Sequence, residues 1–161
     1  MSQNDIIDRK IVELLMEDGR MPAAEIARRV GGGISERVVR YRINRMIADR
    51  IIQIRPIVNP QAFGLTTRAD VVLEVESDRI MEVARKAMEY ECVSYAACSI
   101  GEMDVSIQVV GKDTAEIYRF VTEVIGKMPG VRKTTTSLVP IVLKDVYQWQ
   151  IPQGAFQGKT E

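Results

Sequence analysis

The chain has 161 residues, 46% hydrophobic and 27% charged, which is enough apolar material to bury a core in one domain or two small ones. It contains no histidine, which excludes a histidine general base, the commonest zinc ligand and any Ser/His or Cys/His nucleophile pair. No apolar run approaches the roughly 18 residues that a membrane span needs. Because the first residues are charged where a signal peptide is apolar, a cytoplasmic protein is expected.

The formal net charge is zero but unevenly distributed. Residues 1–60 hold 11 Lys and Arg against 8 Asp and Glu, and residues 61–161 hold 11 against 14. Cys92 and Cys98 are six residues apart, a spacing typical of neither a metal knuckle nor a redox pair. Both are expected to be reduced thiols in or near a core, and no metal, cofactor or catalytic residue is predicted.

The chain begins with two predicted helices. In DIIDRKIVELLMEDGR, four apolar residues recur at helical spacing from Ile7 to Leu15, and Gly19 stands where a helix-ending glycine belongs. A second, shorter helix is expected after Pro22, and it ends at the glycine run 31–33. These glycines do not indicate a phosphate loop, because no Lys-Ser or Lys-Thr follows them and no strand precedes them.

A third helix is predicted from Ser35, a natural N-cap, to about Asp49. Helical periodicity places Val39, Ile43 and Met46 on one side of it and a cationic face on the other. Two short helices joined by a tight glycine turn, the second carrying arginines outward, form a helix-turn-helix arrangement.

After residue 50 the pattern changes to IIQIRPIVNPQAFG, which predicts a strand followed by a connector. Strand and helix patterns then alternate in the order βαββαβ, which is typical of a ferredoxin-like antiparallel sheet with two helices on one face. The segment RKTTTSLVPIVLKDV is expected to form the last strand. The other face of such a sheet must be covered by another chain or exposed.

The predicted class is therefore α+β, with a helix-turn-helix (winged-helix-like) domain and a ferredoxin-like domain. The expected boundaries are 1–52 for the helical domain, 53–65 for a strand and hinge linker, 66–148 for the βαββαβ domain and 149–161 for a polar tail. The tail is expected to fray once Trp149 has docked.

The strings IIDRKIVELLMEDGRMPAAEIARRVG, SERVVRYRINRM, VNPQAFG, GEMD and MPGV occur in that order. Together they resemble the Lrp/AsnC, or feast/famine, family of prokaryotic transcription regulators from residue 4 to about residue 146. The resemblance implies an N-terminal DNA-binding domain and a C-terminal domain that dimerises and senses a small molecule such as an amino acid. It also implies assembly beyond the dimer, up to octamers.

The chain departs from the family pattern at several positions. Arg50 stands where the family usually has a helix-ending glycine, and the turn GGGIS is about one residue longer than usual. In and just before the string GEMD of the predicted sensor domain, Met103 replaces the usual aromatic residue, and Ile100 replaces a threonine or serine. These departures bear on the seating of the third helix and on the identity of any effector.

The third helix is the predicted DNA-reading element, because the N-terminal half of such a helix enters the major groove. Its arginines have almost no acidic neighbours on the same helix, unlike an ordinary solvated face. Arg42 is expected to meet a phosphate or an adjacent helix rather than a base, and Arg45 lies at the margin of the face. The predicted DNA-binding residues are Ser35, Arg37, Arg40, Tyr41, Arg42, Asn44 and Arg45.

The segment SIGEMDVSI links two predicted strands, and Asp104 in it either caps the turn or accepts the ammonium group of a bound amino acid. The run TTTS is either ordinary strand material or a source of hydroxyl donors for a carboxylate. By the resemblance, the pocket lies between protomers. Its predicted residues are Gly101, Met103, Asp104, Thr134, Thr136 and Ser137.

Two other functions remain open at this point. An effector-independent protein that organises DNA would share the basic helix but bind no amino acid. An enzyme is the weaker alternative: the two-domain plan also resembles sirohaem decarboxylases, which are expected to use histidine near the tetrapyrrole, and this chain has none.

Overall fold

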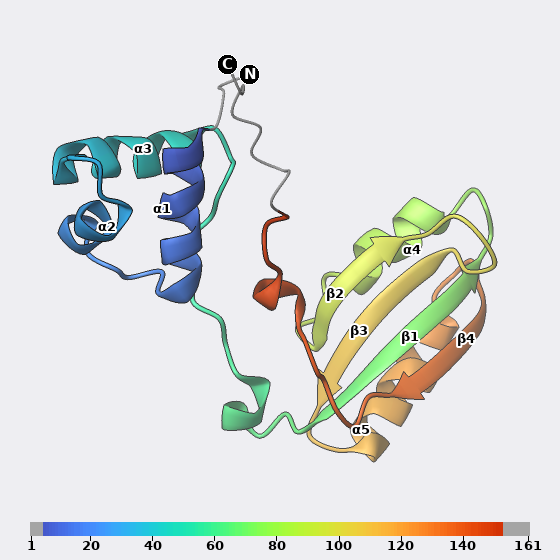
Figure 1. Ribbon diagram of the computed structural model, residues 1–161. Coiled ribbons are helices and arrows are strands. Elements are labelled where there is room, and N and C mark those ends of the chain that lie inside the picture. Colours follow the sequence, from blue (N-terminus) through green and yellow to red (C-terminus); the bar gives the residue numbers. More distant parts are fainter. Residues whose placement is uncertain (1–4, 153–161) are drawn as a thin grey trace. The chain divides into compact units, whose positions relative to one another are not determined.

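The computed structural model describes residues 5–152, which form two compact units (Figure 1). The N-terminal unit comprises the described chain up to Ile57 and the returning segment from Val146, and the C-terminal unit spans Val58–Asp145. The division therefore differs from the expected boundaries at both ends. Ile151 packs against the N-terminal core, whereas Trp149 stays 56% exposed. The expected fraying of the tail, 149–161, is not tested beyond residue 152, because residues 153–161 lie outside the described part.

Three helices form the N-terminal unit: α1 (Ile6–Glu17), α2 (Ala23–Val30) and α3 (Glu36–Ala48). α1 starts with a capping box in which Asp5 and Asp8 each accept a hydrogen bond from the other's backbone amide. The apolar stripes of the three helices meet in one cluster, as the periodicity predicts. Its buried members are Ile11, Val12, Leu14, Ile26, Val39 and Met46.

The end of α3 is a Schellman motif built around an arginine. The Arg50 amide donates to the Ile47 carbonyl and the Ile51 amide to the Met46 carbonyl, while Arg50 has a φ of 58°. The family's glycine would adopt this left-handed conformation without strain, whereas the Cβ of arginine makes it unfavourable.

The strand expected after residue 50 is not present. The chain continues without regular structure to a 3-10 turn at Pro60–Phe63. The described part of the N-terminal unit therefore has three α-helices, a short 3-10 helix at Val146–Gln148 and no wing. A strand requires hydrogen bonds from a neighbouring strand, and the Ile51 and Ile52 amides instead both donate to the Met46 carbonyl. The tertiary position of these isoleucines, against the helical core, overrides their β propensity.

The C-terminal unit has the predicted βαββαβ order. Its elements are β1 (Thr67–Val75), α4 (Ile80–Ala87), β2 (Val93–Cys98), β3 (Val105–Gly111), α5 (Thr114–Arg119) and β4 (Val131–Leu138). α5 continues through a π-helical segment, Phe120–Val124, and a 3-10 turn, Ile125–Lys127. The four strands are antiparallel in the order β2-β3-β1-β4. This is the ferredoxin-like order.

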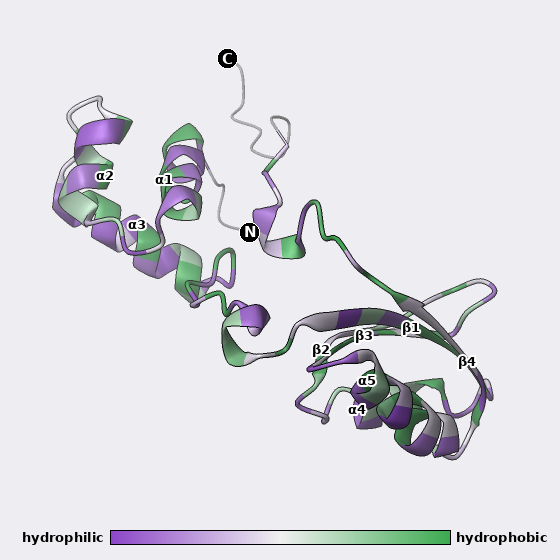
Figure 2. Ribbon diagram, turned by 90° about the horizontal axis from the view of Figure 1, so that it is seen from below, coloured by the Kyte–Doolittle hydropathy of each residue, from purple (hydrophilic) through white to green (hydrophobic). Residues whose placement is uncertain are grey.

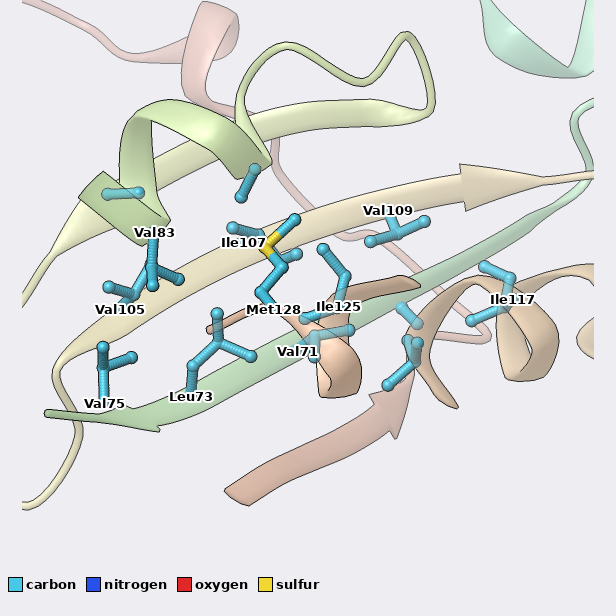
Figure 3. Close-up of a cluster of buried hydrophobic side chains, with 14 residues drawn as sticks. Val71, Leu73, Val75, Val83, Val105, Ile107, Val109, Ile117, Ile125 and Met128 are labelled. Atoms are coloured by element: carbon cyan, nitrogen blue, oxygen red, sulfur yellow. The ribbon is translucent and has the colours of Figure 1, made fainter. Parts of the chain in front are cut away.

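Both helices of this unit cover the same face of the sheet (Figure 2). Side chains from that face interdigitate with the helices in a second core (Figure 3). The core is nearly all aliphatic, and its strand residues alternate as the period of two requires. The largest fully buried side chains of this core are Val71, Leu73, Val75, Val105, Ile107, Val109, Ile117 and Ile125.

Two details of this unit differ from expectation. β4 ends at Leu138, before Pro140, because proline cannot donate to a strand ladder. Cys98 is exposed rather than near-core, while Cys92 is half-buried. Burial raises the pKa of the Cys92 thiol, which favours its protonated form.

Candidate nucleic-acid interface and effector site

The turn before α3 determines where that helix begins. Gly31, Gly32 and Gly33 all have φ near +70°, at 74°, 69° and 74°, a conformation that favours glycine. The Ser35 hydroxyl then accepts a hydrogen bond from the Val38 amide at 3.3 Å, which confirms Ser35 as the N-cap.

The two faces of α3 are divided as the periodicity predicts. Val39 and Met46 are fully buried against α1 and α2. The opposite face is exposed, and it includes the aromatic side chain of Tyr41, which is 67% exposed. The exposed polar residues of this outward face are Arg37, Arg40, Tyr41 and Asn44.

One arginine of the outward face has an acidic partner that the sequence interpretation undervalued. Arg40 Nε donates to Glu36 Oε1 at 2.8 Å, one helical turn away, and both side chains are exposed. Such an exposed pair contributes at most about 1 kcal/mol, so a stronger anion can displace the carboxylate. Arg37 has no ion pair within the described part of the chain.

Arg42 and Arg45, both expected at the DNA, instead contact the start of α1. One guanidinium nitrogen of Arg42 lies 2.8 Å from Asp5 and 2.9 Å from Asp8, and Arg45 bonds the second oxygen of Asp8. Asp8 is completely buried, and the two arginine side chains are only 20% and 25% exposed. Of the two possibilities for Arg42, a phosphate or an adjacent helix, the structure shows the adjacent helix.

The sequence contained a signal for this cluster. Asp8 lies one turn before Ile11, within the apolar stripe of α1. A carboxylate buried among apolar side chains requires a charged partner or several hydrogen bonds, because an unpaired buried charge costs several kcal/mol. The arginines on the next packed helix are the available partners. This buried aspartate was missed because the helix was assigned from its apolar residues alone.

The expected effector loop joins β2 to β3. Gly101 has a φ of 143°, and no atom would lie within 4 Å of an added Cβ, so its backbone conformation rather than space favours glycine. Asp104 accepts a hydrogen bond from the Val75 amide at 2.7 Å, and its own amide donates to the Leu73 carbonyl. The Asp104 carboxylate therefore bonds the end of β1 rather than an amide of its own turn, and both predicted roles, turn cap and effector ligand, stay predictions. Met103, beside it, is half-buried.

Asp104 lies near the beginning of β4 rather than near the hydroxyl run. Its carboxylate is 3.9 Å from the guanidinium of Arg132. Thr134 pairs with Leu73 and Thr136 with Val71, on the helix-covered side of the sheet. Ser137 pairs with Asp70 on the opposite side. The six predicted effector residues therefore do not converge on one pocket within a single chain.

The face of the sheet away from the helices is largely polar, although Val72, Val110 and Tyr95 also lie on it. Gln108 donates to Asp70 at 2.9 Å, and Lys133 bonds Glu74 at 2.8 Å across neighbouring strands. These side chains pair their hydrogen-bonding and charged groups with one another. Leaving this face in water therefore costs less free energy than leaving an apolar face there.

Within residues 5–152, no group of three or more Cys, Asp and Glu side chains is placed to hold a metal ion. The helices of the same described part are too short or too polar to cross a membrane.

A helix-turn-helix with an exposed cationic face, joined to a ferredoxin-like domain, defines a two-domain DNA-binding regulator. The AsnC-type helix-turn-helix domain matches residues 5–47, and the Lrp/AsnC ligand binding domain matches residues 69–148. The chain belongs to the Lrp/AsnC family and is a transcription regulator of that type.

Named relatives agree with this assignment. An uncharacterized HTH-type transcriptional regulator of Pyrococcus horikoshii is 33% identical over 141 residues, which cover 87% of this chain and 88% of the relative. The HTH-type transcriptional regulator FL11 of Pyrococcus abyssi is 32% identical over 136 residues, covering 84% of this chain and 88% of FL11.

Solved structures share the fold. AsnC of E. coli superimposes with a TM-score of 0.79 at 22% identity, covering 89% of this chain and 97% of AsnC. A transcriptional regulator of Neisseria meningitidis, solved as an L-Met complex, superimposes with a TM-score of 0.80 at 23% identity. The match covers 88% of this chain and 92% of the Neisseria chain.

Proposed function

We propose that the outward face of α3 reads base edges in the major groove of an operator. Its four exposed polar side chains on one side of a capped helix carry this proposal. The guanidinium groups of Arg37 and Arg40 match the acceptor pair of guanine, and the Asn44 carboxamide matches adenine. Tyr41 adds an aromatic contact and a hydroxyl at the centre of the same face. Ser35 and the free amides of the first turn lie where a backbone phosphate would be held.

The second part of the proposal concerns a small-molecule effector bound by the C-terminal unit. The match to the Lrp/AsnC ligand binding domain and the L-Met complex of the Neisseria relative support an amino acid as the ligand class. Gly101, Met103 and Asp104 supply one side of this site. The hydroxyls of Thr134, Thr136 and Ser137 belong to it only if they come from a second protomer, since one chain does not bring all six residues together.

The third part is that the protein acts in the cytoplasm as a homodimer or a larger homo-oligomer. Two half-sites on DNA need two reading helices, which a dimer supplies. The family supports this, whereas the polar open face of the sheet gives it little additional weight. An effector could then change the spacing or assembly of the reading helices. Neither the sirohaem-decarboxylase alternative nor the effector-independent one is favoured by the family assignment.

The decisive experiment is selection of bound sites from a random DNA duplex pool, with and without a mixture of amino acids. A recurrent motif with two related half-sites is expected, and its spacing or its recovery should change with the mixture. Recovery of DNA without any sequence preference would contradict the reading role of α3. Calorimetry against each amino acid then identifies the effector, and no binding by any of them would remove the second part of the proposal.

A further inference from the structure

We infer that Asp8 is a positioning residue for DNA recognition, holding the recognition helix through Arg42 and Arg45. This inference rests on the proposed function of α3. Asp8 belongs to α1 and is completely buried, so it cannot itself touch DNA. Of its two partners on α3, Arg42 lies away from the outward face and Arg45 lies at its margin. Its effect on recognition must therefore pass through the two arginines.

The geometry fixes both the rotation and the axial position of α3. Arg42 and Arg45 are three residues apart and approach different oxygens of the same carboxylate. Rotating α3 about its axis, or sliding it along α1, would lengthen at least one of these contacts. The capping box holds Asp8 itself, because its carboxylate also accepts the Asp5 amide at 3.3 Å. The carboxylate is thus a fixed point on α1.

Hydrophobic packing alone would constrain the rotation of α3 about its axis less tightly. Val39 and Met46 are fully buried, but the hydrophobic effect that holds them has no preferred direction. Base readout is sensitive to such rotations, since a bidentate hydrogen bond requires atoms to lie within a few tenths of an ångström and near a straight line. Directional ion pairs supply the constraint that the aliphatic core lacks.

The same cluster also decides which arginines remain available to DNA. Asp5 and Asp8 together balance the charges of Arg42 and Arg45, so these two arginines add no net positive charge to the interface. Sequence discrimination then depends on Arg37, Arg40, Tyr41 and Asn44. Arg42 and Arg45 contribute to recognition by orientation.

The test compares variants of the full chain for affinity to the site selected by the wild type and to a scrambled duplex. Asp8→Asn keeps the shape of the side chain but removes the charge that holds both arginines. For Asp8→Asn, the ratio of the affinity for the selected site to the affinity for the scrambled duplex should fall about fivefold or more relative to the wild type. This is the discrimination that one base contact supplies. Ile26→Val is the matched control, since it destabilises the same core but takes part in no ion pair.

The control separates positioning from simple loss of stability. If Ile26→Val lowers the affinity ratio as much as Asp8→Asn at equal fractions of folded protein, or if Asp8→Asn leaves the ratio unchanged, the inference is wrong. A wild type that selects no DNA sequence would instead contradict the proposed function, so the two failures are distinguishable.

A charge-balanced variant covers the case in which Asp8→Asn does not fold. Asp8→Leu combined with Arg45→Met removes one charge of each sign and leaves the Asp5–Arg42 pair, a replacement that buried ion pairs usually tolerate. We expect a folded protein with a lower affinity ratio and an unchanged salt dependence. Loss of about one unit of salt slope would show that Arg45 contacts a phosphate directly, and wild-type discrimination would overturn the positioning role.

Discussion

The carboxylate of Asp104, just before β3, accepts a hydrogen bond from the Val75 amide at the end of β1. Its backbone also bridges the sheet, because the Asp104 amide donates to Leu73 and the Ser99 amide donates to the Asp104 carbonyl. Asp104 therefore closes the β2–β3 connection onto β1. Any role in binding an effector is superimposed on this structural one.

Asp104→Ala should consequently destabilise the protein without any ligand. The substitution leaves the Val75 amide without its acceptor, which costs about 1–3 kcal/mol for a partly buried group. Urea unfolding of the ligand-free protein measures this loss. Asp104→Asn retains an acceptor oxygen and should lose less, and an Asp104→Ala protein as stable as the wild type would contradict the structural role of the bond to Val75.

Glu36→Gln should strengthen DNA binding. The wild type must break the Arg40–Glu36 ion pair before Arg40 can reach a base, and the variant removes both this competition and a negative charge near the DNA. We expect an affinity gain of up to about 1 kcal/mol, given the usual strength of an exposed pair. Fluorescence anisotropy with a labelled operator gives the value. Glu25→Gln, which frees Arg28 on α2, is the matched control.

Arg37→Ala should weaken operator binding by about 1–3 kcal/mol and relax sequence preference at one position of each half-site. Arg40→Ala should do the same at a neighbouring position. Selection of sites from random duplexes with each variant tests the preference directly. A uniform loss of affinity for all sequences would assign these side chains to phosphates and would show that α3 is oriented differently.

Arg50→Gly should stabilise the N-terminal unit. Arg50 has a positive φ of 58° in the Schellman motif, and removing its Cβ relieves about 1 kcal/mol of backbone strain. Thermal unfolding should show a higher midpoint for the glycine variant. Arg50→Ala retains the Cβ and should show no such gain, so equal stabilisation by both variants would assign the effect to the arginine side chain instead.

The free energy of unfolding of the N-terminal unit should decrease at acid pH because the Asp5 carboxylate becomes protonated. Burial raises the pKa of Asp5, but the Asp8 amide and the Arg42 guanidinium outweigh it and hold the pKa below the ordinary value of 3.8. The folded state therefore favours the carboxylate. The resulting stabilisation is complete above about pH 4 and disappears as the pH falls through the lower pKa of the folded state.

Asp5→Asn tests this dependence, because asparagine retains the N-cap while removing the charge beside Arg42 and Asp8. The difference in unfolding free energy between wild type and variant should be largest near neutral pH and shrink below about pH 4. Asp5 is roughly half exposed, so a difference of no more than about 1 kcal/mol is expected. A difference that does not change with pH would exclude the carboxylate as its source.

The amino-acid sequence by itself determined the local elements of this protein and the faces of its helices. Ser35 caps α3 as predicted because capping depends on residues three apart, and Val39 and Met46 are buried because a helix repeats every 3.6 residues. The βαββαβ order followed from alternating periodicities in the same way. These features can be predicted without knowing which segments pack together in the tertiary structure.

The tertiary structure decided which charged groups meet. Asp8 precedes Arg42 and Arg45 by 34 and 37 residues, and only the packing of α1 on α3 brings them together. That packing decides which arginines of α3 stay on the outward face, Arg37 and Arg40, and which ones hold the helix against α1, Arg42 and Arg45. Residues 51–55 likewise form no strand, since strand propensity cannot supply the neighbouring strand whose hydrogen bonds a strand requires.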